Sequence, residues 1–271
     1  GAKEFVKRRN WRFSKQSHTR YTSRYTAHIE QVECSAETGR TLPHISTNRC
    51  TLVPLRVANT SNLDISNLPP EIHSLYENVF NDPQVMQSYA SGMTSKPEAF
   101  CANVVRQSKR WDNGYPFAAF IVKDTEDSEQ REEGEDVILG YEVIGNSEVL
   151  NAAELAYLLR KDAHGKHIAS ETVGALVCIY GQSLFDTHRS VNQVIGSDKS
   201  FTGGQLFQRV VATARQDNAP SQSVLRGLGF EPYGVTEKFG HTRDEFSRGF
   251  DETIDLVGAA SHPSEDAGLM V

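Results

Sequence analysis

The sequence predicts an α/β fold in which helices flank a mixed sheet. Its 271 residues, of which 38% are hydrophobic and 23% charged, are enough for one large domain with a packed core. Two segments with helical periodicity come early, two β-rich runs follow as a hairpin, and strands then alternate with helices. This order of elements is typical of an α/β sandwich, and the sequence shows no internal repeat.

Composition divides the chain into three parts. Residues 1–48 are expected to form a basic N-terminal extension, 49–257 the domain, and 258–271 a small, polar, flexible tail. In the extension, residues 3–26 hold eight lysines and arginines against one glutamate, with aromatic residues interleaved. Such an arm could bind RNA or an acidic surface, or pack on the domain itself. The net charge of −7 argues against a nucleic-acid partner, which only this arm could contact.

The domain begins with a strand and two helices. Residues 50–58 are apolar and β-rich, which predicts a strand. In residues 69–82, apolar side chains recur at helical spacing after a proline pair, and residues 97–114 show the same spacing up to an Asn-Gly stop.

The middle of the domain carries the hairpin and the longest apolar helix. Residues 116–124 and 136–145 predict two strands, and the acidic residues 125–135 between them predict an exposed loop. Residues 153–159 predict a further strand, and after a polar turn a helix is expected to run to about Leu184.

The last part of the domain returns to strands. Residues 186–205 are polar and without periodicity, and we expect an inserted loop that either shapes substrate choice or is an idle surface loop. Residues 206–215 predict a strand and 219–229 a short helix, and residues 231–240 and 244–257 predict the final strands.

A single glycine, Gly165, directly precedes the apolar helix. The first four N–H groups of a helix have no partner inside it and carry the positive end of the helix dipole. Glycine lets another backbone or a phosphate approach these groups closely. The segment therefore predicts either an anion-binding loop or an ordinary junction between a loop and a helix.

The sequence has no motif for a metal site, a membrane segment or a disulfide framework. The four cysteines are scattered, and they are expected to be reduced thiols, with a bridge between Cys34 and Cys50 as the alternative. The nine histidines form no metal-ligand motif. No signal peptide and no apolar run of bilayer length are recognised. We expect a cytoplasmic protein, monomeric or homodimeric, with no metal and no membrane contact.

Three motifs together resemble one enzyme family. The run "NAPSQSVLRGLGFE" (218–231) is similar to the hallmark of the GNAT acyltransferases, in particular the RimJ/RimL branch that acetylates protein N-termini. The segment "AELAYLLRKDAHGKHIASE" (153–171) resembles that branch's "AE-x-GY" strand and "G-x-G-x-ASE" loop, and "FNDPQVMQSYASG" (80–92) resembles its early motif. The resemblance covers about three quarters of the chain. It implies a mixed, mostly antiparallel, twisted sheet with a splayed central strand pair.

The resemblance implies a binding site for acetyl-CoA, with no metal. In the family, the loop before the helix holds the cofactor's pyrophosphate with backbone amides. Carried over to this chain, the residues of that loop and its flanks are Lys161, His164, Gly165, Lys166, His167, Ile168 and Ala169. Asp162 and His167 depart from the family pattern of a basic or amide residue and a second small residue. These departures could weaken binding of CoA.

The resemblance also implies a path for the pantetheine arm of CoA. It would pair with backbone groups near Leu158 and Leu159, and Asn218 would hold its other side. The two leucines could equally serve core packing, and the two roles are compatible because the contact uses the backbone.

Acetyl transfer to an amine needs a proton acceptor and a stabilised leaving thiolate. Glu154 matches the glutamate that is the base in histone-acetylating relatives, although it could instead be a salt-bridged strand residue, and Glu142 is the fallback. Leu225 stands where many members carry the tyrosine that protonates the thiolate. The branch implicates a serine instead, here Ser221, whose alternative role is a helix N-cap.

The expected activity is therefore acetyl transfer from acetyl-CoA to a primary amine by direct attack. The acceptor could be a protein N-terminus, a lysine or a small amine. The alternative is a catalytically weak or inactive GNAT-like module that binds CoA or a partner. Five residues are expected to line the acceptor cleft: Tyr89, Tyr115, Tyr233, Glu237 and His241.

Overall fold

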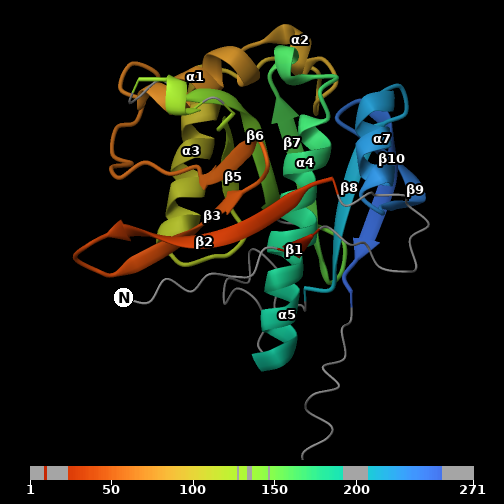
Figure 1. Ribbon diagram of the computed structural model, residues 1–271. Helices are drawn as coiled ribbons and strands as arrows, with labels where there is room; N and C mark the ends of the chain where they lie inside the picture. The colour runs from red at the N-terminus through yellow and green to blue at the C-terminus, as the bar shows by residue number, and fades with distance from the viewer. Residues whose placement is uncertain are drawn as a thin grey trace, which may run out of the picture.

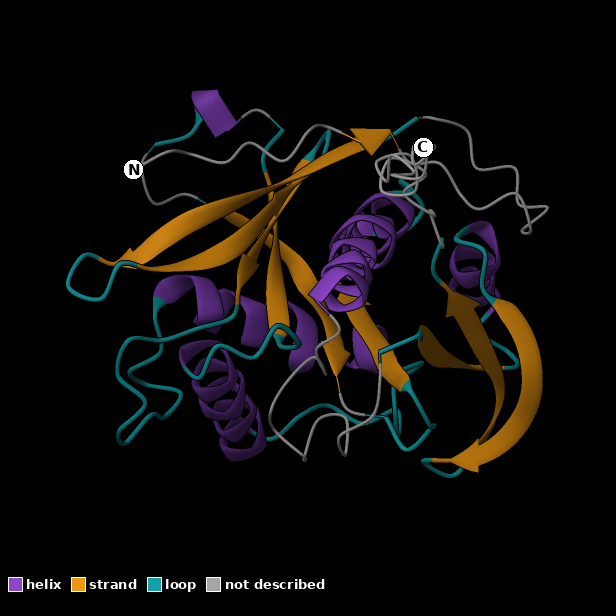
Figure 2. Ribbon diagram, turned by 90° about the horizontal axis from the view of Figure 1, so that it is seen from below, coloured by secondary structure: helices purple, strands orange, loops and turns teal. Residues whose placement is uncertain are grey.

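A sheet of ten strands runs through the protein, with helices on both of its faces (Figures 1 and 2). The computed structural model describes residues 9–10, 24–126, 128–132, 136–145, 147–191 and 207–251. Within these residues the strand order is β1-β2-β3-β4-β5-β6-β7-β8-β10-β9. Every neighbouring pair is antiparallel except β7 and β8, so the expected mixed, mostly antiparallel sheet flanked by helices is confirmed.

The strands follow one another along the sheet as far as β8, and the last two then exchange places. Their bounds are β1 Arg9–Asn10, β2 Thr26–Ser35, β3 Arg40–Ser46, β4 Cys50–Pro54, β5 Ala119–Asp124, β6 Val137–Gly145, β7 Ala152–Leu159, β8 Arg209–Arg215, β9 Glu231–Lys238 and β10 His241–Gly249.

The helices form two groups, one on each face of the sheet (Figure 2). One group is α1 Pro70–Leu75, η1 Tyr76–Phe80, α2 Pro83–Met86 and α3 Pro97–Asp112. The other is α4 Ile168–Gly174, η4 Ala175–Gly181 and α5 Gln182–Val191, followed by α7 Ala219–Gly227. Two short turns, η2 Ser128–Gln130 and η3 Lys161–Ala163, complete the set among the described residues.

Most predicted elements are confirmed. The expected helices 69–82 and 97–114 correspond to α1 with η1 and to α3, and the expected hairpin corresponds to β5 and β6. The first predicted strand is shorter than expected, because β4 ends at Pro54. Beyond it the backbone turns to α3, where the Val57 amide donates to Ser108 Oγ at 3.0 Å.

The sheet extends across the domain boundary expected at residue 48. Strands β2 and β3 lie at residues 26–46, pair with each other and join the domain through β4. They bury Ala27, Ile29, Leu42 and Ile45 in the same core as the apolar helix. Their outer face is polar and charged, so the apolar alternation is diluted along the sequence. The expected boundary at 257, the tail from 258 and most of the basic arm lie outside the described residues.

The segment 186–205 was expected to be a loop, but its first part is helical. Helix α5 continues to Val191, and within it Gln182 Nε2 donates to Asp186 Oδ1 at 2.9 Å. This i,i+4 contact extends the helix past the last strongly apolar turn. Residues 192–206 and the expected strand end at 252–257 lie outside the described residues.

Elements α4, η4 and α5 make one continuous helix that packs on the sheet. By length and composition, Ile168–Thr187 could cross a membrane, with a mean hydropathy of 1.2, which the sequence analysis did not anticipate. However, 67% of that window is buried inside the domain, where η4 contacts β2, β3 and β6. Burial in the core therefore accounts for its apolar character.

Strands β7 and β8 diverge soon after they pair. Their parallel register joins Ala152–Glu154 to Arg209–Val211 and ends there, although β7 continues to Leu159 and β8 to Arg215. The expected splayed strand pair is thus present. Beyond Glu154, the side of β7 that faces β8 has no partner strand among the described residues.

Candidate active site

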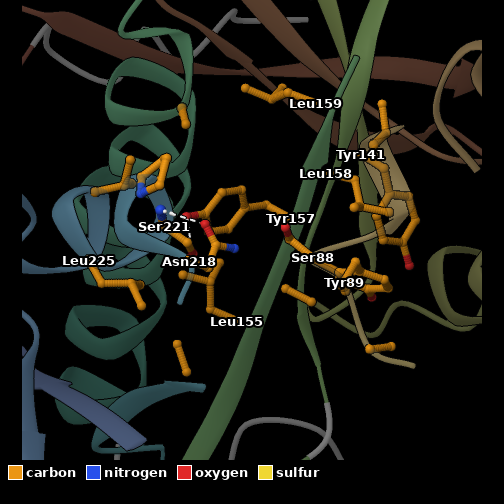
Figure 3. Close-up of a pocket in the computed structure, with 18 of the residues that line it drawn as sticks. Ser88, Tyr89, Tyr141, Leu155, Tyr157, Leu158, Leu159, Asn218, Ser221 and Leu225 are labelled. Atoms are coloured by element: carbon orange, nitrogen blue, oxygen red, sulfur yellow. Dashed lines mark hydrogen bonds between the residues drawn. The ribbon is translucent and has the colours of Figure 1, made fainter. Parts of the chain in front are cut away.

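A cavity of about 940 Å³ lies where β7 and β8 diverge, between α3, α4 and α7 (Figure 3). Two separate segments of sequence supply the residues that were predicted to form the site. Those that line the cavity are Glu154, Leu158, Leu159, Lys161, His164, Gly165, His167, Ile168, Ala169, Asn218 and Ser221. Lys166 does not line it, because this side chain is exposed outside the cavity.

The loop before α4 has two left-handed residues. Gly165 has φ +75°, and a Cβ built there would meet no atom within 4 Å. His167, the N-cap of α4, has φ +60° and ψ 20°, and no side chain caps the helix. Histidine is among the non-glycine residues that adopt this conformation comparatively often, so its Cβ does not exclude the loop geometry. The helix start and the open space over Gly165 together fit an approaching anion.

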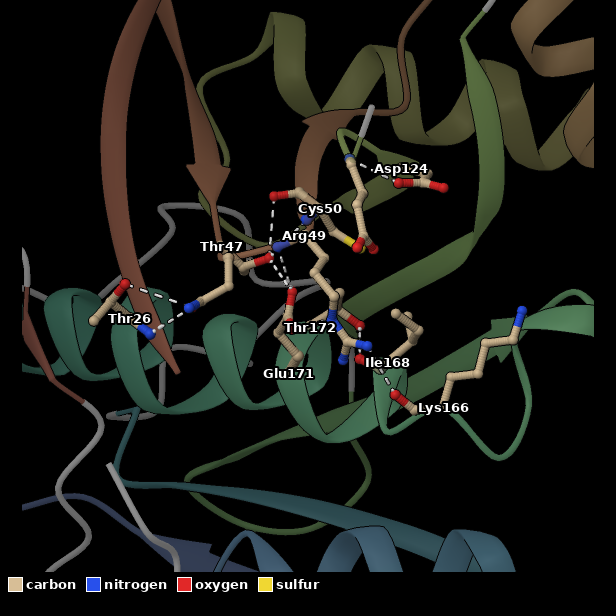
Figure 4. A network of polar contacts seen from close by, with 11 residues as sticks. Thr26, Thr47, Arg49, Cys50, Asp124, Lys166, Ile168, Glu171 and Thr172 are labelled. Carbon is tan, nitrogen blue, oxygen red and sulfur yellow. Dashed lines mark hydrogen bonds and ion pairs between the residues drawn. The ribbon is translucent and has the colours of Figure 1, made fainter. Parts of the chain in front are cut away.

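A buried carboxylate anchors this loop to the β3–β4 turn (Figure 4). Glu171 is fully buried and accepts bonds from Thr47 Oγ1 at 2.7 Å, from the Arg49 amide at 2.9 Å and from Arg49 Nε at 2.8 Å. Arg49 Nη1 also donates to the carbonyl of Lys166 at 3.0 Å. The sequence analysis missed this contact, because Arg49 lies 122 residues from Glu171.

The other end of the loop is tied to β7. His164 Nε2 lies 2.9 Å from the carbonyl oxygen of Leu159 and acts as the donor, because a carbonyl only accepts. That carbonyl, expected to face the pantetheine arm, is therefore already bonded. Asp162, the departure from the family pattern, pairs with Arg160 Nε at 2.7 Å and is mostly exposed.

The proposed base is held in an ion pair. Glu154 Oε1 accepts from Lys238 Nζ at 2.9 Å, and 28% of its side chain is exposed in the cavity. This ion pair fixes the position of the carboxylate in the lining of the cavity. Glu142, the fallback, does not line the cavity. It is fully buried, accepts from Thr172 Oγ1, and burial raises its pKa to about 8.

Two hydroxyl groups meet across the cleft. Tyr157 Oη of β7 lies 2.8 Å from Ser221 Oγ of α7, and both side chains line the cavity (Figure 3). Burial raises the pKa of Tyr157 to about 12, so the phenol is protonated at neutral pH. Ser221 is not the cap of α7, because Asn218 Oδ1 accepts from the Ser221 amide at 3.2 Å. Leu225 contributes only an apolar wall.

Tyr157 was not expected at the site, although it lies in the matched "AELAYLL" strand. Its place in an apolar run predicted only a strand residue. Its contact partner, Ser221, lies 64 residues away in the sequence, so no local pattern reveals the contact. Of the five residues expected at the acceptor end, Tyr89 lines the cavity. Tyr115 borders a separate hollow. Tyr233, Glu237 and His241 do not line the cavity, because their hairpin contributes Lys238, Phe239 and Arg243 to it instead.

The cavity is basic although the chain is acidic. Its lining has five lysines and arginines, Arg106, Arg110, Lys161, Lys238 and Arg243. Against them stand two carboxylates, Glu154 and Asp217. A net positive lining in a chain of net charge −7 favours an anionic ligand.

The described part of the chain has no side-chain cluster for metal binding or cysteine chemistry. There, no group of three or more His, Cys, Asp or Glu residues could hold a metal ion. All four cysteines are free thiols, and none of them lines the cavity.

Comparisons with known proteins agree with this geometry. The model of the family described as "Acetyltransferase (GNAT) domain" matches residues 65–231. No curated protein matches the chain in sequence. Similar solved structures include RimL, the ribosomal L7/L12 alpha-N-protein acetyltransferase, in complex with coenzyme A. It is 18% identical, with a TM-score of 0.51 over 76% of this chain and 97% of that one.

Two further structures are similar at lower scores. The ribosomal-protein-S5-alanine acetyltransferase from Vibrio fischeri is 14% identical, with a TM-score of 0.49 over 77% of this chain and 97% of that one. A GNAT acetyltransferase from Bacillus anthracis is 16% identical, with a TM-score of 0.47 over 74% and 95%. At such identities the solved structures speak for the fold alone. The family model spans more than half of the chain, and this protein therefore belongs to the GNAT family of acetyltransferases.

Proposed function

We propose that this protein transfers the acetyl group of acetyl-CoA to a primary amine by direct attack in the cavity between β7 and β8. One observation carries the proposal. A single basic cavity runs from the uncapped start of α4, along the unpaired side of β7, to the carboxylate of Glu154. These are the features that a pyrophosphate, an extended pantetheine arm and a reacting amine require.

The cofactor end rests on the backbone. The amides at the start of α4 would hold the pyrophosphate, with open space over Gly165 and Lys161 as a counter-charge. Unpaired backbone groups of β7 up to Leu158 would pair with the pantetheine arm as an added strand. Acetyl-CoA supplies the acetyl group and the leaving thiolate.

At the reacting end, Glu154 accepts the proton of the attacking amine, directly or through one water. As the carbon–sulfur bond breaks, the Ser221 hydroxyl donates a hydrogen bond to the thiolate, and the protonated Tyr157 phenol donates in turn to Ser221. Direct attack is favoured because no cysteine lies among the lining residues.

The acceptor class follows from the branch that the motifs resemble. A protein N-terminus is the first acceptor to test, followed by lysine side chains and small amines. RimL, by its name, acts on the N-terminus of a ribosomal protein, and here it serves only to choose that first substrate.

Titration calorimetry with acetyl-CoA and turnover with N-terminal peptides test the proposal together. We expect Glu154→Gln to keep the affinity for acetyl-CoA and to lower kcat by about 100-fold or more at neutral pH, because the amine then has no base. Glu231→Gln, on exposed β9, is the matched control and should leave both quantities unchanged. Unchanged turnover in Glu154→Gln would remove this residue from the role of base.

The competing candidate is a CoA-binding module without turnover. The ion pair between Glu154 and Lys238 is the observation in its favour, because a carboxylate committed to a lysine is a weaker base. Binding of acetyl-CoA without acetylation of any amine would support it. Absence of binding at millimolar acetyl-CoA would exclude both candidates.

A further inference from the structure

Arg243 of β10 carries a buried charge that no described group fully pairs. Only 6% of this residue is exposed, and it lines the cavity. Its Nε donates to Thr213 Oγ1 at 2.8 Å and its Nη2 to the Thr213 carbonyl at 3.1 Å. Its Nη1 is shielded from solvent and has no hydrogen-bond partner in the described part of the chain. A buried guanidinium that bonds only neutral oxygens is costly, because its charge has lost water and gained no anion.

The neighbouring charges are already paired with one another. Arg215 bonds both oxygens of Asp217, at 2.9 and 2.6 Å, and Lys238 pairs with Glu154. Burial and the nearby Arg215 lower the pKa of Arg243, which shows the same lack of compensation, although a guanidinium stays protonated. In this corner of the cavity, three cations thus stand against two carboxylates, and Arg243 is the cation left over.

An aromatic ring, not an anion, lies over this cation. The Arg243 Cζ lies 5.9 Å from the centroid of the Phe239 ring, and Lys238 Nζ lies 5.2 Å from the same centroid. Phe239 is half exposed, lines the cavity and sits in the β9–β10 turn with φ +56°. The cover is thus the side chain of a hairpin turn at the rim, and it can move aside without disturbing the core.

The position of Arg243 assigns it to the acceptor. Thr213, which holds it, lies two residues beyond the last β7–β8 pair at Glu154 and Val211, roughly 7 Å along the strand. β7 continues in the same direction for five more residues, to Leu159, before the loop and the start of α4, where the phosphates would bind. Arg243 shares the Phe239 ring with Lys238, the partner of Glu154, so it lies beside the proposed base and not at the phosphate loop.

We propose that the acceptor carries a carboxylate close to its reacting amine and that Arg243, with Lys238 beside it, binds this carboxylate. The proposal rests on the proposed acetyl transfer and names its substrate class: a free amino acid, or a peptide with an acidic side chain within its first two residues. A carboxylate fits the two-pronged guanidinium better than a spherical anion does. It would pair Nη1, and it would free Glu154 to accept the proton by drawing Lys238 away.

The experiment compares matched acceptors with and without an anionic group, using the full chain and acetyl-CoA. The pairs are an amino acid and its amide, a peptide beginning Ser-Asp and one beginning Ser-Asn, and O-phosphoethanolamine and ethanolamine. We expect kcat/KM to favour the carboxylate member of at least one of the first two pairs by about 30-fold or more. Which of these pairs shows the preference identifies the source of the carboxylate. Preference for the phosphate pair alone would overturn the carboxylate assignment.

Arg243→Gln should collapse this preference to a few-fold, and Arg243→Lys should restore part of it. The melting temperature and the affinity for acetyl-CoA report whether the variant is folded. A binding readout independent of turnover is titration of the acetylated product peptides, in acid and amide forms, onto the protein with CoA. If Arg243→Gln does not fold, Thr213→Val takes its place. This variant removes the Oγ1 group to which Arg243 Nε donates, and it should reduce the preference for the carboxylate acceptor.

The outcomes separate the carboxylate site from the proposed acetyl transfer on which it rests. Equal kcat/KM for the acid and amide members, or an undiminished preference in Arg243→Gln, overturns the carboxylate site and leaves acetyl transfer standing. Acetyl-CoA binding without transfer to any of these amines overturns both.

Discussion

At Gly165, backbone strain and the space for a ligand can be separated by experiment. Gly165→Val places a β-branched residue at φ +75°, which costs about 1–2 kcal/mol, and fills the open space over the helix start. We expect a fall of a few degrees in Tm together with loss of acetyl-CoA binding. Lys166→Ala should change that affinity by about threefold or less, because the Lys166 side chain lies outside the cavity.

Gly39, in the β2–β3 turn, is the matched control. It has φ +62° and, like Gly165, no atom within 4 Å of a built Cβ. Gly39→Val should therefore lower Tm by a similar amount and leave the affinity unchanged. Equal affinities in the two variants by calorimetry would show that the loop does not hold the cofactor.

Glu142 should make stability depend on pH. Burial raises its folded-state pKa to about 8, whereas its ordinary value is 4.5, and one carboxylate oxygen has no partner among the described groups. The folded protein thus binds this proton more tightly than the unfolded chain. Its contribution is retained below about pH 4.5 and declines as the pH rises toward about 8, by at most about 1.4 kcal/mol per pH unit.

The variant Glu142→Gln tests this dependence. It cannot ionise, so its free energy of unfolding, measured in urea between pH 5 and 8, should decline less steeply than that of the parent. Glu231→Gln should follow the parent. Parallel curves for parent and Glu142→Gln would mean that the carboxyl is not the group that titrates.

The sequence predicted residues better where the backbone determines the role. Except for Lys166, the loop residues 164–169 line the cavity, and so do Leu158 and Leu159 at the end of the strand, since turn residues and periodicity act over short spans. Arg49 and Tyr157 were missed because their partners lie 122 and 64 residues away, and no local pattern encodes such contacts. The hairpin residues Tyr233 and His241 were expected at the cavity by segment, but only the fold decides which hairpin positions reach it.

At the scale of elements, one ion pair sets where α4 begins. Arg49 joins the turn before β4 to Glu171 in the first turn of α4 and to the Lys166 carbonyl in the loop. Arg49→Leu should lower the free energy of unfolding by about 1.5–3 kcal/mol, because Glu171 stays buried with fewer donors. The affinity for acetyl-CoA should fall several-fold as the loop loses its anchor.

Arg40→Leu provides the comparison. Arg40 lies 3.9 Å from Asp112 with 42% of its side chain exposed, so its loss should cost less than about 1 kcal/mol and no affinity. Urea unfolding and calorimetry on both variants decide the matter. An Arg49→Leu protein with parental affinity would show that the loop keeps its shape without the anchor.

At the scale of the whole molecule, strands β2 and β3 raise the question of where the domain starts. A chain beginning at Arg24 should unfold cooperatively like the parent. A chain beginning at Arg49 lacks Ala27, Ile29, Leu42 and Ile45, and large apolar side chains contribute about 1.5–3 kcal/mol each when buried. That loss is comparable to the entire stability of a domain, so we expect the shorter chain not to fold.

Thermal unfolding and circular dichroism of the two truncated chains provide the measurement. A cooperative transition in the chain that begins at Arg49 would place the boundary at residue 48, as the composition alone suggested. The sequence missed these strands for a physical reason: an antiparallel strand with one solvent-exposed face needs few apolar residues and therefore leaves a weak pattern.

The brevity of the parallel pairing between β7 and β8 also has a mechanical meaning. Among the described residues, three residue pairs form the strand pairing between the first seven strands, β1 to β7, and the unit made of β8, β10 and β9. Side-chain packing and bonds such as Tyr157–Ser221, Lys238–Glu154 and Arg215 to the Gln87 carbonyl carry the remaining attachment. Such a seam allows the C-terminal unit to rock as one body about Glu154. A ligand bound along β7 would then contact both units and restrict this motion.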